Sequence, residues 1–423
     1  MKAVMMFFAD FHIHSSYSRA TSKDLNLESL TKYAKIKGLN ILGTGDFLHP
    51  KWQPELKTKL SEENGIYTYN GINFILSCEI SLIYVQGKKQ RRVHHILLAP
   101  NFEVLQQITE WFLRKGRVDY DGRPIFGFSS IELAEAMMQI SNDIEIIPAH
   151  AWTPWYGIFG SMSGFDSVEE CFGDKAKYIH AIETGLSSTP EMNWRVSSLD
   201  KYMMVSFSDC HSAFPWRLGR ECCLFDLKEA SYKEIIDAIR NKQGGKLRTT
   251  IEFFPEEGKY HFDGHRNCNF SCDPKESKKL HDLCPVCRRN LTIGVLNRVE
   301  QLADREEGFM PKHVVPSKSL IPLSELIALV NNTTPYATKT WEAYNKLIAA
   351  HGNEFKVLLE TGKEKLADTV GENVADIIIR NRNGEIKIIP GYDGVYGKPV
   401  LSGDGAIKQP VPRKQKSLDQ FFS

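Results

Sequence analysis

The sequence predicts an α/β protein of several domains, with a closed or nearly closed barrel over residues 1–250, a small cysteine-containing module over 251–300 and a mainly helical domain over 301–401. Three observations predict this class. Strand-like apolar runs alternate with helix-like runs along the first 250 residues, which favours a parallel sheet. Four cysteines cluster between residues 268 and 287. Apolar residues recur at helical spacing between residues 340 and 380.

The composition sets limits on partners and location. A chain of 423 residues is long enough for two or three domains. Its 53 Lys and Arg balance 52 Asp and Glu, so any nucleic-acid surface must arise from local segregation of charge. No apolar run is long enough to span a bilayer, and the apolar start is too short for a signal peptide. We therefore expect a cytoplasmic, nucleoid-associated protein whose cysteines do not form structural disulfides.

The elements of the barrel follow one another along the chain. An apolar run into residues 8–15 reads as a strand, whose alternation places His12 and His14 on one face. Asn26 can cap the following helix, and Gly38 can end it. Further strands are expected at residues 39–43, 74–81, 93–99, 144–148, 178–182 and 202–207, with helices at 130–140 and 232–241.

Metal-type side chains stand at the borders of these strands. Such sites gather at the carboxyl ends of barrel strands, so the set predicts one metal centre rather than scattered core histidines. Glu183 also ends a strand and is a candidate either for contacting the site or for a structural hydrogen bond. The candidates are His12, His14, Asp46, His49, Glu79, His95, His150, Asp209 and His211.

The ordered set resembles the PHP (polymerase and histidinol phosphatase) family of metal-dependent phosphoesterases. The resemblance rests on His12-x-His14, Glu79 after an apolar strand, His95-Ile96-Leu97, Ala149-His150 and Ser208-Asp209-x-His211. It implies a distorted seven-stranded β/α barrel, the (β/α)7 PHP barrel, with two or three divalent ions. It also favours His95 over His94 as the ligand.

The resemblance further implies particular ligand sets. The first ion would be held by His12, His14, Glu79 and Asp209, and the second by Glu79, His95 and His150. Arg19 and Phe47 replace two groups that usually serve a third ion, so a third ion on His211 would have to recruit Asp46 or His49.

The ligand types predict the chemistry. Imidazoles and carboxylates suit zinc, manganese or iron, with Mg²⁺ as a further candidate for activity. Two ions that share a carboxylate can generate hydroxide at neutral pH and clamp the oxygens of a displacement at phosphorus. Asp209, His211 and Asp46 are the candidate catalytic residues, which would orient the water or protonate the leaving oxygen.

An aromatic loop at residues 152–160 directly follows His150. Its aromatic residues could pack as a structural lid. The alternative is stacking on an unpaired base, for which Trp152, Trp155 and Tyr156 are the candidates.

The cysteine cluster predicts a second metal site. Cys268, Cys272, Cys284 and Cys287 have the spacing of a closed four-thiolate zinc site, which would be structural, with free thiols or a disulfide as alternatives. His265 and His281 could each substitute for one ligand. Residues 266–298 carry an excess of Lys and Arg, so Arg288 and Arg289 are candidates for contacts with a nucleic-acid backbone, against a merely solvated face.

The last residues predict a partner. Residues 402–414 are rich in Gly and Pro and are expected to form a flexible linker. The end of the chain matches the sliding-clamp-binding peptide of replication and repair enzymes (the PIP box, which binds PCNA), against a tail that folds back on its own core. This peptide spans residues 415–423, and its expected anchors are Gln415, Leu418, Phe421 and Phe422.

Taken in this order, the domains resemble a family of archaeal PHP-domain DNA-repair endonucleases. The resemblance implies double-stranded DNA as substrate, with incision on the 5′ side of a deaminated base (uracil, hypoxanthine or xanthine) or an abasic site, leaving 3′-hydroxyl and 5′-phosphate ends. Two alternatives remain open. One is a small-molecule phosphomonoesterase on the same barrel, and the other is a clamp-associated DNA-binding protein without catalysis.

Overall fold

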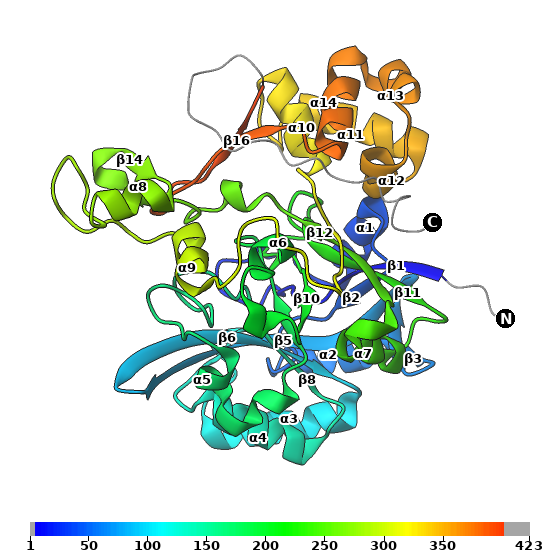
Figure 1. Ribbon diagram of the computed structural model, residues 1–423. Coiled ribbons are helices and arrows are strands. Elements are labelled where there is room, and N and C mark those ends of the chain that lie inside the picture. The colour runs from blue at the N-terminus through cyan, green and yellow to red at the C-terminus, as the bar shows by residue number, and fades with distance from the viewer. Residues whose placement is uncertain (1–4, 402–423) are drawn as a thin grey trace.

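One large mixed sheet forms the centre of the protein (Figure 1). The computed structural model describes residues 5–401, so the predicted linker and clamp peptide lie outside the described residues. The strand order is β15-β12-β11-β1-β2-β5-β4-β3; β6 and β7 also pair with β5, and β8 pairs with β6. The strands are β1 (Met5–Asp10), β2 (Ile41–Gly43), β3 (Ser61–Glu63), β4 (Ile66–Tyr69), β5 (Ile72–Gln86), β6 (Lys89–Ala99), β7 (Ile125–Phe126), β8 (Glu145–Pro148), β11 (Cys222–Leu227), β12 (Leu247–Glu252) and β15 (Ser317–Ser319).

A separate parallel pair, β9 (Ala181–Glu183) and β10 (Met203–Val205), extends this arrangement. β9 lies beside β8, and an isolated bridge joins Ile13, just after β1, to Cys210, just after β10. The mixed α/β class is therefore confirmed. Closure into a seven-stranded barrel stays a prediction.

The expectation of a parallel sheet is wrong for most strand pairs. β1 pairs in parallel with β2, and β2 with β5, but β1–β11, β11–β12, β5–β6 and β6–β8 are antiparallel. The reason at β5 and β6 is local. Gly87 and Lys88 both have positive φ, at 61° and 63°, which is the conformation of a tight two-residue hairpin turn.

Helices cover the sheet on both sides (Figure 1). α1 has the predicted caps, since the Asn26 side chain accepts a hydrogen bond from the Ser29 main chain and Gly38 is left-handed. α3 was not predicted, although Asn101 caps it in the same way. These helices are α1 (Leu27–Lys37), α2 (Trp52–Lys59), α3 (Phe102–Lys115), α4 (Ser130–Ile140), α5 (Val168–Phe172), α6 (Pro190–Asn193) and α7 (Tyr232–Arg240).

The helical C-terminal region packs against the start of the chain. A fully buried ion pair joins Lys37 of α1 to Glu354 at 2.8 Å, and Phe8 stacks on Phe355 with ring centroids 4.4 Å apart. The segment before this region contributes β15, which pairs with β12 and so joins the C-terminal region to the main sheet. The helices are α9 (Val295–Leu302), α10 (Leu323–Asn331), α11 (Thr338–His351), α12 (Glu354–Leu359), α13 (Lys363–Val370) and α14 (Glu372–Arg382).

The cysteine-containing module projects from one end of the molecule (Figure 1). It consists of the hairpin β13 (Asp263–His265) and β14 (Phe270–Cys272), followed by α8 (Pro274–Lys279). The C-terminal hairpin, β16 (Lys387–Ile389) and β17 (Lys398–Val400), reaches its base, where Tyr392 bridges to Phe262. Within residues 5–401, none of the helices has the length and apolar character needed to cross a membrane.

Candidate metal centre and active site

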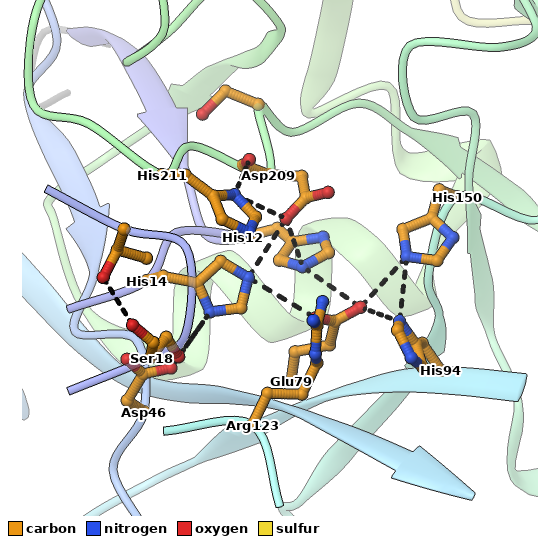
Figure 2. A network of polar contacts seen from close by, with 12 residues as sticks. His12, His14, Ser18, Asp46, Glu79, His94, Arg123, His150, Asp209 and His211 are labelled. Carbon is orange, nitrogen blue, oxygen red and sulfur yellow. Dashed lines mark hydrogen bonds and ion pairs between the residues drawn. The ribbon is translucent and has the colours of Figure 1, made fainter. Parts of the chain in front are cut away.

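Two overlapping groups of histidines and carboxylates meet between residues that follow β1, β8 and β10 and residues inside β5 and β6 (Figure 2). One group comprises His12, His14, Glu79 and Asp209, and the other comprises Glu79, His94 and His150. Within each group, the potential ligand atoms all lie within 4.8 Å of one another. Glu79 belongs to both groups, so it is placed to bridge two cations.

Three residues in and beside these groups have a strained backbone conformation. Asp46, His150 and Asp209 each follow a central strand and each has a positive φ, at 47°, 29° and 46°. Non-glycine residues rarely adopt this conformation, and where they do it is often at functional sites. The sharp turn at each strand end directs these side chains back over the end of the sheet.

Buried carboxylates behind His12 and His14 fix both rings. The Nδ1 atom of His12 lies 2.9 Å from Glu183, and that of His14 lies 3.0 Å from Asp46. Each Nδ1 therefore donates a proton backwards, and each Nε2 faces Glu79 and Asp209, at 3.0 to 3.6 Å. Such carboxylate–histidine pairs orient imidazoles as metal ligands.

The residues present fit a metal ion. The Nε2 atom of His12 is buried and has no hydrogen-bond partner among the described residues, although it points at two carboxylates. A buried nitrogen left without a partner is costly unless a cation accepts its lone pair. The donor set of imidazole and carboxylate suits Zn²⁺ or Mn²⁺. The structure thus brings together the four residues predicted for the first ion, and their role as ligands stays a prediction.

Electrostatics in the centre favour ionised carboxylates. Burial opposes ionisation of Glu79, but His94, Arg123 and His12 more than offset it and hold its pKa well below the usual value. Burial likewise opposes ionisation of Asp209, and His12 and His14 lower its pKa. Burial lowers the pKa of His94 to about 4, so that ring is neutral. His12 and His14 differ, because burial is outweighed by Glu183 and Asp209 at His12 and by Asp46 and Asp209 at His14, which raise the pKa of both rings well above the usual value. A cation would have to displace a proton from each ring before it binds the neutral imidazole.

The assignment of His95 to the second ion is wrong, because His94 takes that place. In the β5–β6 ladder, Glu79 pairs with Ile96, so Ile96 and His94 share the face of Glu79 and His95 faces the opposite side. His95 instead bonds Ser130 at 2.8 Å and packs against Phe172. The Nδ1 atom of His94 lies 2.6 Å from Glu79.

The third-ion residues do not form a further metal group among the described residues. Asp46 accepts hydrogen bonds from His14, Ser15 and Ser18 and lies behind His14 rather than beside a cation. His49 stacks on Tyr17, with ring centroids 4.5 Å apart. His211 lies close to His14, and its Nδ1 donates to the main-chain oxygen of Asp209 at 3.0 Å. The structure thus gives Asp46 a supporting position and leaves His49 outside both groups.

Sequence reasoning missed Arg123, which lies beside Glu79 (Figure 2). Its Nη1 atom is 2.9 Å from Glu79 Oε2. No periodicity or motif around residue 123 pointed to this role, because a long loop brings the residue to the site just before β7.

The aromatic loop divides into a buried and an accessible part. Trp152 is fully buried, donates to Asn193 and packs on Phe159, so its assignment to base binding is wrong. Trp155 and Tyr156 stay partly exposed. Tyr156 lies over the His94 ring, with centroids 4.3 Å apart, so it borders the metal centre.

The module gathers His265, Cys268, Cys284 and Cys287 within 4.8 Å, and Cys272 is not in this group. Cys272 pairs with Asp263 in the β13–β14 hairpin, two cross-strand pairs beyond His265, which corresponds to about 7 Å along the strand. The structure thus gathers one histidine with three of the four predicted cysteines, and the four-thiolate set stays a prediction. Two residues separate His265 from Cys268, and two residues separate Cys284 from Cys287. This repeated spacing was visible in the sequence. Arg288 and Arg289 are exposed beside Cys287.

An α/β fold that gathers histidines and carboxylates into two groups sharing one carboxylate defines the class of metal-dependent hydrolases. Comparison with solved structures is more specific. The lesion-specific endonuclease PfuEndoQ from Pyrococcus furiosus is 33% identical, with a TM-score of 0.85 over 94% of this chain and 96% of that one. A structure of endonuclease Q with a 27-mer duplex substrate, carrying an abasic lesion at the active site, has a TM-score of 0.84 and 33% identity, and covers 94% of this chain and 97% of that one.

The chain belongs to the endonuclease Q family and is an enzyme of the endonuclease class. Residues 322–385 match the family model described as the MJ0043 C-terminal domain. The uncharacterised protein MJ0043 of Methanocaldococcus jannaschii is 30% identical over 292 residues, which are 68% of this chain but 35% of that protein. The match thus spans about a third of the length of MJ0043. The uncharacterised protein YqxK of Bacillus subtilis is 26% identical over 92% of this chain and 98% of its own.

Proposed function

We propose that the protein is a DNA-repair endonuclease that hydrolyses the phosphodiester bond on the 5′ side of a damaged nucleotide. Its substrates would be duplexes that contain a deaminated base (uracil, hypoxanthine or xanthine) or an abasic site, and its products would carry 3′-hydroxyl and 5′-phosphate ends. The observation that carries the proposal is the similarity, over 94% of the chain, to an endonuclease Q that holds an abasic duplex at its active site.

The candidate ligands have defined positions for this chemistry. His12, His14, Glu79 and Asp209 would hold one cation, and Glu79, His94 and His150 a second. Two such ions supply an activated water at neutral pH and stabilise charge on the phosphate oxygens. Glu183 and Asp46 keep the Nδ1 protons of His12 and His14 directed away from the site. His211 donates through Nδ1 to the main chain, so its Nε2 is free for exchanging a proton with the leaving oxygen.

Two further surfaces fit a damaged duplex. Tyr156, at the border of the metal centre, and its neighbour Trp155, which packs edge-on against Tyr260, would stack against the extruded nucleotide. The exposed Arg288 and Arg289 would contact the backbone, together with other basic residues of the module.

The direct test uses fluorescent duplexes that contain uracil, hypoxanthine, xanthine, an abasic site or no lesion, incubated with and without chelator. We expect a single nick on the 5′ side of each lesion, no nick in the undamaged duplex and loss of nicking with chelator. His12→Ala and Asp209→Ala should both abolish the nick. His95→Gln is the matched control, since His95 faces away from the site and should retain metal-dependent nicking.

The same preparation separates the alternatives. Hydrolysis of p-nitrophenyl phosphate without nicking of any duplex would favour a phosphomonoesterase. Duplex binding without hydrolysis of either substrate would favour a non-catalytic DNA-binding protein. Unchanged nicking in both the His12 and Asp209 variants would remove this metal centre from the mechanism.

We further propose that residues 415–423 bind a sliding clamp. Replacing Phe421 and Phe422 together by Ala should abolish binding of the clamp on a sensor chip and leave nicking without the clamp unchanged. Equal clamp affinity of the wild-type protein and the double variant would contradict the assignment of residues 415–423 as the clamp-binding peptide.

A further inference from the structure

Arg123 places a positive charge at the edge of the metal centre. Its guanidinium bonds Glu79, the carboxylate shared by both candidate metal groups, and its side chain is 26% exposed. The residue is therefore both accessible to solvent and in contact with the carboxylate that the two groups share (Figure 2).

The loop that carries Arg123 is fixed on both sides. The main-chain nitrogen of Gly122 donates to Tyr17, and that of Ser81 in β5 donates to Pro124, each at 3.0 Å. A Cβ atom on Gly122 would lie 2.3 Å from Asp46 Oδ2 and 2.4 Å from Ser18 Oγ, so the loop rests directly on the residues behind His14. Fixed donors of this kind bind a charged group without reorganising first.

A second contact anchors the same loop at its buried aspartate. Asp121 accepts hydrogen bonds from the main chain of Arg19 and of Arg123, at 3.1 and 3.2 Å. The loop after His14 and the loop before β7 are thereby joined. The position of Arg123 is consequently set by the same segment that carries the histidine ligands.

The chemistry of guanidinium indicates the partner. Its five N–H groups form a planar fork that matches two oxygens of a phosphate. The bond to Glu79 uses Nη1, so the fork keeps donors for a second anion. The alternative is that Arg123 only neutralises the charge of Glu79. Replacing Arg123 by an uncharged residue distinguishes these two roles.

We propose that Arg123 is a catalytic residue that binds a non-bridging oxygen of the scissile phosphate and stabilises the charge that develops there. This inference rests on the proposed function. It adds to the two candidate metal groups a protein cation that acts on the same phosphorus.

The test compares Arg123→Gln and Arg123→Lys with the full-length protein. Arg117→Gln is the matched control, because Arg117 lies on the same segment, is exposed and pairs with Asp119. We expect Arg123→Gln to lower the single-turnover nicking rate by about 10²–10³-fold, as loss of an electrostatic donor does. Arg123→Lys should recover only part of this, because a single ammonium lacks the fork. Arg117→Gln should nick at the wild-type rate.

Metal content and phosphate binding provide readouts that do not depend on nicking. Removing a cation beside a metal site reduces repulsion, so Arg123→Gln should retain at least the wild-type amount of bound metal. Its affinity for inorganic phosphate, measured by calorimetry on the metal-loaded protein, should fall at least about tenfold, the equivalent of 1.4 kcal/mol. Loss of metal together with activity would show a structural role and overturn the proposal.

Two other outcomes are decisive. Wild-type nicking and wild-type phosphate affinity in Arg123→Gln would show that the residue merely neutralises Glu79. If the wild-type protein nicks no lesion duplex, the proposed function fails. The phosphate titration then still decides the role of Arg123, since unchanged affinity in the variant would refute it and a tenfold loss would support phosphate binding.

Discussion

Two sets of carboxylates inside this protein are held in opposite protonation states, although Asp209, whose side chain is 22% exposed, is less buried than the other three. Glu79 and Asp209 face imidazoles and a guanidinium, and their pKa values lie well below the usual range despite burial. Glu221 and Glu252, next to the site, face main-chain amides and hydroxyl groups. Burial raises the pKa of Glu221 well above its ordinary value and that of Glu252 to about 8.

The difference shows what distinguishes a metal centre from a buried polar core. Burial alone favours the neutral acid, because desolvation penalises the charged form. Neutral hydrogen-bond donors do not reverse this for Glu252, whereas several cationic or imidazole neighbours do so for Glu79. A carboxylate kept charged inside the protein therefore marks the place where a cation can bind.

The largest expected effect comes from Glu79→Gln, which removes the charge shared by both metal groups. Each ion contributes several kcal/mol to stabilising the transition state, so nicking of a lesion duplex should fall by about 10³-fold or more. Elemental analysis should show loss of metal from this centre. Glu252→Gln makes the same chemical change at a carboxyl that is already protonated, and nicking should persist. Equal losses of nicking in the two variants would contradict the distinction between the charged Glu79 and the protonated Glu252.

Glu252 also predicts how stability depends on pH. Its pKa rises from an ordinary value of 4.5 to about 8 on folding, so the folded protein holds a proton that the unfolded chain releases. The stabilisation is fully present below pH 4.5 and is lost as the pH rises through about 8, by an amount on the order of a few kcal/mol. Glu252→Gln should flatten this fall in urea unfolding measured across that range. Because burial also raises the pKa of Glu221, part of the fall in stability with pH should remain in this variant. An unchanged dependence of stability on pH would contradict the raised pKa of Glu252.

Much of the centre could be predicted from the sequence, because strand ends set where side chains go. His12 and His14 flank Ile13 just after β1, and His150 and Asp209 each follow a strand, so the order of metal-type residues located them. The error at His95 arose because the motif did not fix which of two adjacent histidines faces inward. That depends on the register with β5, where Glu79 pairs with Ile96.

Other features depend on packing that a single sequence does not reveal. Arg123 reaches Glu79 because Gly122 lies against Asp46 and Ser18, which precede it by 76 and 104 residues in the chain. Trp152 looked like a base-stacking residue by its position, but its buried bond to Asn193 makes it part of the core. The prediction of parallel pairing is wrong for β5 and β6, because a two-residue turn joins them into an antiparallel hairpin. This turn could have been recognised from Gly87 and its flanking strands.

A smaller effect is expected from the carboxylates that support the ligands. Glu183→Gln and Asp46→Asn leave the metal groups intact but weaken the hold on the His12 and His14 rings. Loss of such partners typically lowers metal affinity or activity by about 10–100-fold. Titration with a competing chelator measures the affinity directly. The proposed distinction between ligand and support requires that both variants bind metal more tightly than Glu79→Gln.

The smallest effect extends the comparison from carboxylates to thiols. Burial raises the pKa of Cys272 to about 12, while burial of Cys284 is outweighed by main-chain donors from Cys287 and Val286, which lower its pKa to about 7. Because Cys272 also lies outside the group of His265, Cys268, Cys284 and Cys287, Cys272→Ser should retain the metal of the module. Its stability should fall by only about 1 kcal/mol, as for a small buried group replaced by a polar one. Cys284→Ser is the matched variant and should release the metal, measured by a chromogenic chelator. Release of metal by Cys272→Ser would restore the four-thiolate set and show that the distance along the β13–β14 hairpin does not decide the ligands.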